Sequence, residues 1–129
     1  MPEIRITIDS KEILCDSESS ILYIAAQNGI SIPNLCYLKD MSPYGACGMC
    51  VVEAEGSPKL LRACSAKPRD GMVIHTDTER VIKTRKTALE LLMSDHDGDC
   101  IGPCSLNCPA HTDCQKYIAE TAEKTTRER

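Results

Sequence analysis

The stretch "CYLKDMSPYGACGMC", residues 36 to 50, is the key to this sequence, because it holds three of the nine cysteines of the 129-residue chain. Together with Cys64 they have the spacing C-x10-C-x2-C-x13-C. Two cysteines separated by two residues can hold one iron from a single tight turn. Zinc is the alternative, but zinc sites usually contribute two C-x2-C pairs. The order of one, two and one cysteine favours a 2Fe-2S cluster bound by Cys36, Cys47, Cys50 and Cys64.

Two glycines, Gly45 and Gly48, lie beside the cysteine pair of this stretch. Glycine has no side chain to obstruct a close approach of the backbone, so backbone N–H groups here can point at the cysteine sulfurs. Such hydrogen bonds stabilise the additional negative charge of a reduced iron–sulfur cluster. The glycine positions therefore agree with a redox cluster.

The residues before the cysteine stretch predict a hairpin and a helix. In residues 1–15, isoleucines alternate with polar residues on both sides of the turn Asp9-Ser10-Lys11, as expected for a β-hairpin. The segment "SSILYIAAQNG" then predicts a helix. Ser19 or Ser20 is its expected N-cap, and Gly29 is its expected stop.

The residues after the cysteine stretch complete a small domain over residues 1–76. Strands are expected in "MCVVEA" (49–54) and "GMVIHT" (71–76), with irregular chain from Pro58 to Arg69 between them. Four strands and one helix in this order are compatible with an α+β roll.

Beyond residue 76 the pattern changes to that of a long amphipathic helix. The sequence "TDTE", Thr76 to Glu79, has the form of a capping box. Apolar residues then recur at helical spacing, so residues 77–94 are expected to form a linker helix. Thr112 to Gln115 is a second possible capping box, which predicts a short C-terminal helix. This helix has too few apolar residues to be stable without packing partners.

The composition excludes several classes of function. Apolar residues make up 42% of the chain, with no Trp or Phe, so we expect an aliphatic core. The net charge is −4 and no basic stripe occurs, so no nucleic-acid partner is expected. We expect neither a signal peptide nor a membrane span, because no apolar run is long enough. The expected location is the cytoplasm, where thiols stay reduced and cysteine-rich spacing indicates metal or redox chemistry rather than disulfides. The odd number of cysteines also disfavours a closed disulfide framework.

A second cysteine-rich segment, "HDGDCIGPCSLNCPAHTDC", covers residues 96 to 114. It contains four cysteines and two of the three histidines of the chain. A lone histidine is normally a solvated side chain, but His96 directly precedes three evenly spaced cysteines. We interpret residues 95–129 as a second metal-binding segment.

Residues 1 to about 94 closely resemble the 2Fe-2S ferredoxin domain that opens the large iron–sulfur subunit of respiratory complex I. Related NAD-linked hydrogenases and formate dehydrogenases begin with the same domain. The ten-residue gap before Cys47 is typical of this group, whereas plant-type ferredoxins have C-x4-C-x2-C. The resemblance implies a β-grasp fold for residues 1–76. Cys15 lies outside the motif and is expected to be a buried structural thiol.

The second segment resembles two families at once. In complex I relatives the motif H-x3-C-x2-C-x5-C holds a 4Fe-4S cluster, and His96 and Cys100 agree with its start. The stretch "CIGPCSLNCPAHTDCQKYIA" instead looks like the cysteine segment opening the small subunit of glutamate synthase and related flavoprotein transhydrogenases. These resemblances imply one 4Fe-4S cluster. Its leading ligand set is His96, Cys100, Cys104 and Cys108, with Cys114 as the alternative ligand.

Together the two resemblances imply a non-catalytic subunit that relays single electrons. The chain has no nucleotide-binding fingerprint and no nucleophile paired with a base. It looks like the small iron–sulfur subunit of a Stn-type electron-bifurcating NAD(P)H–ferredoxin transhydrogenase. The implied partners are flavoprotein subunits that bind NAD(H) and NADP(H) in a hetero-oligomeric complex. Alternatives are the same relay in a bifurcating NAD-dependent hydrogenase or formate dehydrogenase, a zinc-stabilised assembly module without a redox role, and a redox sensor.

Overall fold

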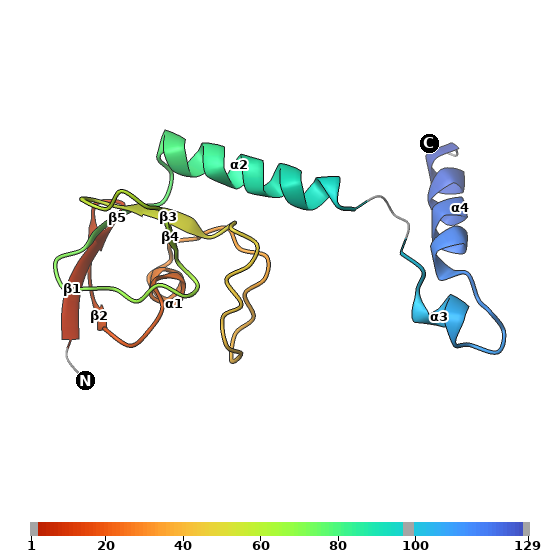
Figure 1. Cartoon of the computed structure of the whole chain (residues 1–129), viewed down its shortest axis with the longest axis horizontal. Helices are drawn as coiled ribbons and strands as arrows, with labels where there is room; N and C mark the ends of the chain where they lie inside the picture. The colour runs from red at the N-terminus through yellow and green to blue at the C-terminus, as the bar shows by residue number, and fades with distance from the viewer. Residues whose placement is uncertain (1–2, 97–99, 128–129) are drawn as a thin grey trace. The chain divides into compact units, whose positions relative to one another are not determined.

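A computed structural model of the chain describes residues 3–96 and 100–127, with side chains as far as residue 124 (Figure 1). The chain divides into two compact units, Met1–Asp95 and His96–Arg129. The first unit contains a mixed sheet with two helices, and the second contains two further helices.

The N-terminal hairpin expected from the isoleucine alternation is confirmed. Strand β1 (Glu3–Ile8) pairs antiparallel with β2 (Lys11–Asp16), and Ile6 lies opposite Ile13. Asp9 and Ser10 form the turn, with φ angles of 46° and 70°. Positive φ at both positions gives a two-residue turn whose twist matches that of the flanking strands.

Helix α1 (Ile21–Gln27) begins and ends where the sequence indicates. The Ser20 hydroxyl accepts a hydrogen bond from the Tyr23 amide at 3.3 Å, so Ser20 is the N-cap. Gly29 has a φ of 75° just after the helix. The helix buries the side chains of Ile21, Leu22, Ile24 and Ala25.

Three further strands complete a sheet with the order β2-β1-β5-β3-β4. They are β3 (Val51–Ala54), β4 (Leu61–Arg62) and β5 (Val73–His75). β5 is parallel to β1, and the other neighbouring strands are antiparallel. The expected α+β class is therefore confirmed, although β4 lies in chain that we expected to be irregular. The core is aliphatic, and its largest fully buried side chains include Ile6, Ile8, Ile21, Val52 and Ile74.

Helix α2 (Glu79–Ser94) does not begin with the expected capping box. The N-cap is Thr78, whose hydroxyl accepts from the Val81 amide at 3.3 Å. Thr76 is instead bound to Asp9: its amide donates to the carboxylate at 2.8 Å, and its hydroxyl donates to the second carboxylate oxygen. The capping box at Thr76 was wrong because a residue distant in sequence takes its hydroxyl.

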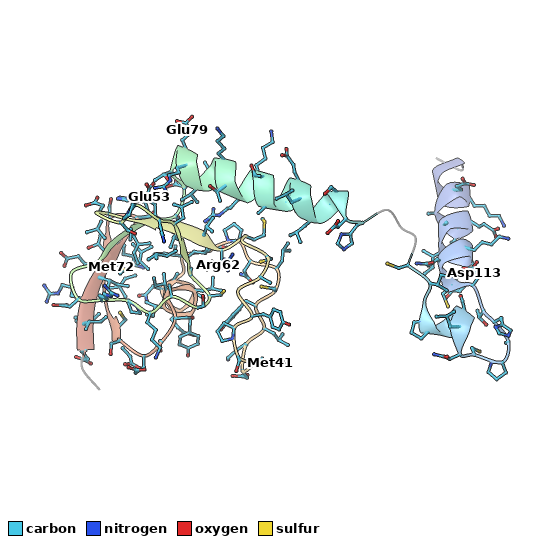
Figure 2. The ribbon with its side chains drawn as sticks, viewed as in Figure 1. Met41, Glu53, Arg62, Met72, Glu79 and Asp113 are labelled. Atoms are coloured by element: carbon cyan, nitrogen blue, oxygen red, sulfur yellow. The ribbon has the colours of Figure 1, made fainter. Side chains whose placement is uncertain are left out.

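Helix α2 packs on the sheet and belongs to the first unit. Its residue Val81 is fully buried. The Thr78 hydroxyl donates to Glu53 on β3 at 2.7 Å, and Arg80 pairs with the same carboxylate at 3.3 Å. Figure 2 shows Glu53 close to the start of the helix at Glu79. These contacts hold the start of α2 against β3, the strand that directly follows the cysteine stretch.

The second unit consists of α3 (Pro103–Leu106) and α4 (Cys114–Arg127). Helix α3 lies in the cysteine-rich segment that we expected to be a loop, and the C-terminal helix is present. The first turn of α4 is capped by the Asp113 carboxylate, which accepts a hydrogen bond from the Lys116 amide at 3.0 Å. The capping box expected at Thr112 was therefore wrong. Within residues 3–96 and 100–127, no helix has the length and apolar character needed to cross a membrane.

Candidate metal centre

The four cysteines of the first motif come from three places in the first unit. Cys36 lies in the loop after α1, Cys47 and Cys50 lie in the turn before β3, and Cys64 follows β4. The Ala63 amide donates to the Cys50 carbonyl at 3.0 Å, which continues the β3–β4 pairing. The pairing of these two strands therefore brings Cys50 and Cys64 together.

The four thiols are arranged as two pairs. The Cys36 thiol interacts with the Cys47 thiol, and the Cys50 thiol with the Cys64 thiol. The inner pair is buried, with exposed fractions of 2% for Cys50 and 1% for Cys64, whereas Cys36 and Cys47 are partly exposed. The pKa of the Cys50 thiol is raised to about 11, mainly by burial and also by the neighbouring Cys64 and Cys47 thiols, while a backbone hydrogen bond from Cys64 opposes the rise.

Backbone amides point at Cys47, as the glycine positions predicted. Gly45 and Gly48 have φ angles of 64° and 70°, the left-handed region that favours glycine. The Met49 amide donates to the Cys47 sulfur at 3.5 Å. Burial raises the pKa of Cys47, but hydrogen bonds from the backbone of Met49, Cys36 and Leu35 and from the Cys36 side chain outweigh it and lower the pKa to about 7.

The chemistry of this donor set fits a 2Fe-2S cluster. Each iron of such a cluster takes two protein ligands, which matches two pairs of thiols. Amide donors at Cys47 suit a thiolate that shares the negative charge of the cluster. Among the described residues, no three His, Cys, Asp or Glu side chains are grouped as a site for one metal ion.

Arg85 on α2 reaches the same turn and was not identified from the sequence. Its Nη2 atom donates to the Val51 carbonyl at 2.8 Å, one residue after Cys50. Its Nε atom is buried and has no hydrogen-bond partner within the described part of the chain. Burial lowers the pKa of Arg85, while the charges of Cys50, Asp77 and Asp9 raise it. Helical periodicity gave no signal for this residue, because an arginine on an amphipathic helix normally lies in solvent.

Exposed apolar side chains surround the loop that carries Cys36. We call the set of Leu35, Leu38, Met41 and Tyr44 the collar, and their exposed fractions are 60%, 63%, 65% and 86%. Figure 2 shows Met41 at the tip of this loop, away from the sheet. Large apolar side chains gathered in solvent are typical of a surface that another protein covers.

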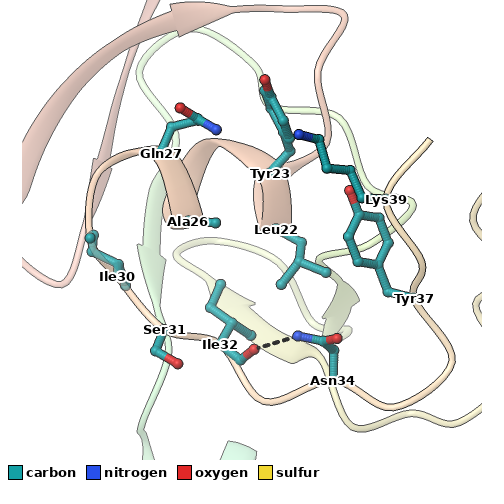
Figure 3. A pocket seen from close by; sticks show the side chains of 11 residues that line it. Leu22, Tyr23, Ala26, Gln27, Ile30, Ser31, Ile32, Asn34, Tyr37 and Lys39 are labelled. Carbon is teal, nitrogen blue, oxygen red and sulfur yellow. Dashed lines mark hydrogen bonds between the residues drawn. The ribbon is translucent and has the colours of Figure 1, made fainter.

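A cavity of about 450 Å³ lies between α1 and the base of the same loop. Figure 3 shows Leu22 from α1 and Ile32 from the loop facing each other across it, with Tyr37 and Lys39 at one side. The side-chain nitrogen Nδ2 of Asn34 donates to the Ile32 carbonyl at 3.0 Å and stiffens the turn before Cys36. A second cavity, of about 600 Å³, lies between α2 and the turn that contains Cys47.

In the second unit the structure brings together Cys104 on α3 and Cys114 at the start of α4. Their side chains interact, and the Cys114 thiol also interacts with the Tyr117 hydroxyl. The interaction with Cys104 raises the pKa of Cys114, and the charge of Cys114 raises the pKa of Tyr117. The second unit thus places the alternative ligand, Cys114, against one member of the leading set.

The other members of the leading set differ in their exposure to solvent. His96 is exposed after the end of α2, Cys100 is exposed, and Cys108 is partly buried. Residues 97–99, which separate His96 from Cys100, lie outside the described residues.

The remaining histidines and Cys15 have structural contacts. The His111 ring nitrogen Nδ1 bonds the Ser105 carbonyl at 2.9 Å, and His75 pairs with Glu55 at 2.9 Å. Cys15 on β2 packs against the core but is only partly buried, and burial raises its pKa.

Comparison with known proteins gives a family match over residues 1–79, to the 2Fe-2S iron-sulfur cluster binding domain. The chain is 37% identical over 100 residues to the mitochondrial NADH-ubiquinone oxidoreductase 78 kDa subunit of Candida albicans, covering 78% of this chain and 14% of that protein. It is 40% identical over 116 residues to the NADP-reducing hydrogenase subunit HndD of Solidesulfovibrio fructosivorans. This match covers 82% of this chain and 20% of that protein. Among solved structures, an NAD+-reducing NiFe hydrogenase in its H2-reduced state matches with a TM-score of 0.67 and 29% identity.

These similarities differ in extent along the chain. The hydrogenase structure covers 75% of this chain, and this chain covers 41% of that one. The match to the HndD subunit covers 82% of this chain, more than the first unit, Met1–Asp95, contains. That similarity therefore continues into the second unit. This chain spans no more than a fifth of either curated relative described above, 14% of one and 20% of the other.

Proposed function

Because this chain belongs to the family of 2Fe-2S iron-sulfur cluster binding domains, we propose that it relays single electrons between flavoprotein subunits of an NAD(P)H-dependent oxidoreductase complex. The observation that carries the proposal is the pair of thiol contacts in the first unit, with backbone amides pointing at Cys47. The mixed sheet against α1 supports the β-grasp assignment of the domain.

The proposed ligands of the 2Fe-2S cluster are Cys36, Cys47, Cys50 and Cys64. The contacts between the thiols support one iron on Cys36 and Cys47 and the other on Cys50 and Cys64, rather than one iron on the C-x2-C pair. When bound, the cluster supplies one-electron redox chemistry without proton transfer. The protein holds the ligands, provides amide donors to sulfur, and excludes water from the buried pair.

The second unit is proposed to hold a 4Fe-4S cluster. The leading ligands are His96, Cys100, Cys104 and Cys108, and Cys114 is the alternative. The contact between Cys104 and Cys114 supports a place for Cys114 at the site, either as a ligand or as a hydrogen-bond donor to a ligand. Exposed apolar residues in this unit support its completion by a partner subunit: Ile101, Leu106, Tyr117 and Ile118.

The finer proposal is a subunit of a Stn-type electron-bifurcating transhydrogenase, located in the cytoplasm between an NAD(H)-binding and an NADP(H)-binding flavoprotein. The second candidate is the same relay in a bifurcating NAD-dependent hydrogenase or formate dehydrogenase. The similarity to a NADP-reducing hydrogenase subunit that extends past the first unit favours this second candidate. Identification of the flavoproteins that copurify with the chain from its host separates the two.

The test of the relay is the metal content and redox behaviour of the chain purified anaerobically with its partners. About two iron atoms at the first site and about four at the second are expected, with matching sulfide. Cys47→Ser and Cys50→Ser should each remove the 2Fe-2S signal in electron paramagnetic resonance. Cys15→Ser is the matched control and should leave this signal intact. A colourless protein that contains zinc would establish the assembly module instead.

A further inference from the structure

Arg85 and Ala88 are among the residues of α2 that face the cysteine turn. The Arg85 guanidinium donates to the Val51 carbonyl at 2.8 Å, directly after the buried ligand Cys50. A Cβ atom placed on Gly48 would lie 3.5 Å from the Ala88 Cβ, so the Ala88 side chain faces the turn at Gly48. The guanidinium is thus held beside the inner pair of cysteines by both its own helix and the turn.

The environment of this guanidinium is incomplete in the protein alone. Its Nε donor is buried and has no acceptor among residues 3–96 and 100–127. None of the ion pairs found in this part of the chain involves Arg85, although the charges of Asp77 and Asp9 act on it from beyond ion-pair distance. The side chain is half-buried, and a positive charge that is partly withdrawn from water is stabilised by a further negative charge nearby. The thiolates of a bound cluster are anionic and would provide that charge.

We propose that Arg85 provides a fixed positive charge beside the buried ligands of the 2Fe-2S cluster and thereby raises its reduction potential. This inference rests on the proposed function of the first unit. A cluster bound by four thiolates is anionic and becomes more negative by one charge when it accepts one electron from a one-electron donor such as dithionite. No bond breaks and no proton moves. A nearby positive charge therefore stabilises the reduced form more than the oxidised form.

Lys86, the next residue on the same helix, offers a matched control. Its side chain is 77% exposed, and its ammonium lies 3.9 Å from the Glu90 carboxylate, one turn further along. Solvent and salt screen a charge in this position, so its removal should have little effect on a cluster in the domain interior. Arg85→Met and Lys86→Met remove the same charge from adjacent positions and leave an unbranched side chain in both.

The experiment is a dithionite titration of the full chain, with the 2Fe-2S signal followed by electron paramagnetic resonance. Arg85→Met should shift the midpoint potential downward from that of the wild type, and the shift should persist at high salt. Lys86→Met should leave the potential unchanged. An unchanged potential in Arg85→Met, or an equal shift in Lys86→Met, would overturn the proposal.

Two further variants keep the test decisive if Arg85→Met does not retain the cluster. Arg85→Gln removes the charge but keeps a donor for the Val51 carbonyl, and Arg85→Lys keeps the charge. The potential of Arg85→Lys should be closer to that of the wild type than the potential of Arg85→Gln. If all three variants lose the cluster, Arg85 is required for assembly and the proposal is wrong. A wild-type chain with no 2Fe-2S signal would instead contradict the proposed function.

Discussion

The thiols of Cys104 and Cys114 interact across the segment that joins α3 to α4, and this interaction raises the pKa of Cys114. Cys104 is one of three evenly spaced cysteines, and Cys114 follows them after a longer gap. Their contact places Cys114 beside a proposed ligand of the second cluster. The ligand set of this site is therefore the first question for experiment.

With His96 as the fourth ligand, Cys114→Ser should retain the 4Fe-4S cluster, because the serine hydroxyl keeps a donor for Cys104. His96→Cys should also retain the cluster but lower its reduction potential, since a thiolate brings a negative charge that imidazole lacks. His96→Ala should make the cluster labile. Redox titration with electron paramagnetic resonance in the assembled complex measures all three. Loss of the cluster in Cys114→Ser, with no shift in His96→Cys, would assign the ligand role to Cys114.

Gly48→Ala should destabilise the cysteine turn through its backbone conformation. The added methyl group would meet Ala88 at an ordinary 3.5 Å, so the cost arises from the φ of 70°. A non-glycine residue in this region costs about 1–2 kcal/mol. Retention of the 2Fe-2S cluster should fall as well, because the strained turn directs the Met49 amide at Cys47. Visible absorbance of the cluster and denaturant unfolding measure the two effects.

Gly56→Ala is the control for this prediction. Gly56 has a φ of 76°, and a Cβ atom there would meet nothing within 4 Å. The loss of unfolding free energy should be similar, while the cluster should remain bound. Equal cluster loss in both variants would mean that general instability, rather than the geometry of the cysteine turn, releases the iron.

Thr78→Ala should lower the free energy of unfolding of the first unit by about 1 kcal/mol, the usual effect of losing an N-cap side chain. The variant also removes the hydrogen bond to Glu53. Thr78→Ser should recover most of the stability. Thr84→Ala on the same helix removes a hydroxyl that donates to the Arg80 carbonyl, and it should be neutral or slightly stabilising. A denaturant series on the four proteins would contradict the assignment if Thr78→Ala matched the wild type.

Ile118→Glu should disrupt assembly with the partner subunit. Ile118 is 59% exposed on α4, and a charge in an apolar contact surface is costly to bury. The isolated chain should then lose the 4Fe-4S cluster and keep about two iron atoms in the first unit. Leu14→Glu, at a position of 65% exposure on β2, is the control and should still copurify with the partner. Stable retention of both clusters by the isolated chain in air would contradict dependence on a partner.

The sequence alone determined the features that depend on neighbouring residues. The hairpin turn at Asp9, the Ser20 cap and the positive φ at Gly45 and Gly48 follow from backbone preferences that act over a few residues. The spacing from Cys36 to Cys64 led to the 2Fe-2S family, which the comparisons confirm. Iron–sulfur ligands are recognisable in this way because their spacing along a tight turn is narrowly restricted.

Only the tertiary structure decided the features that join distant residues. Thr76 is not the cap of α2, because the parallel pairing of β1 with β5 brings its hydroxyl to Asp9. The packing of α2 on β3 brings the half-buried Arg85 side chain to the Val51 carbonyl, directly after Cys50. The contact of Cys104 with Cys114 depends on how the chain turns between α3 and α4. A polar side chain forms a hydrogen bond with the partner that the folded chain brings close to it. The local sequence does not specify that partner.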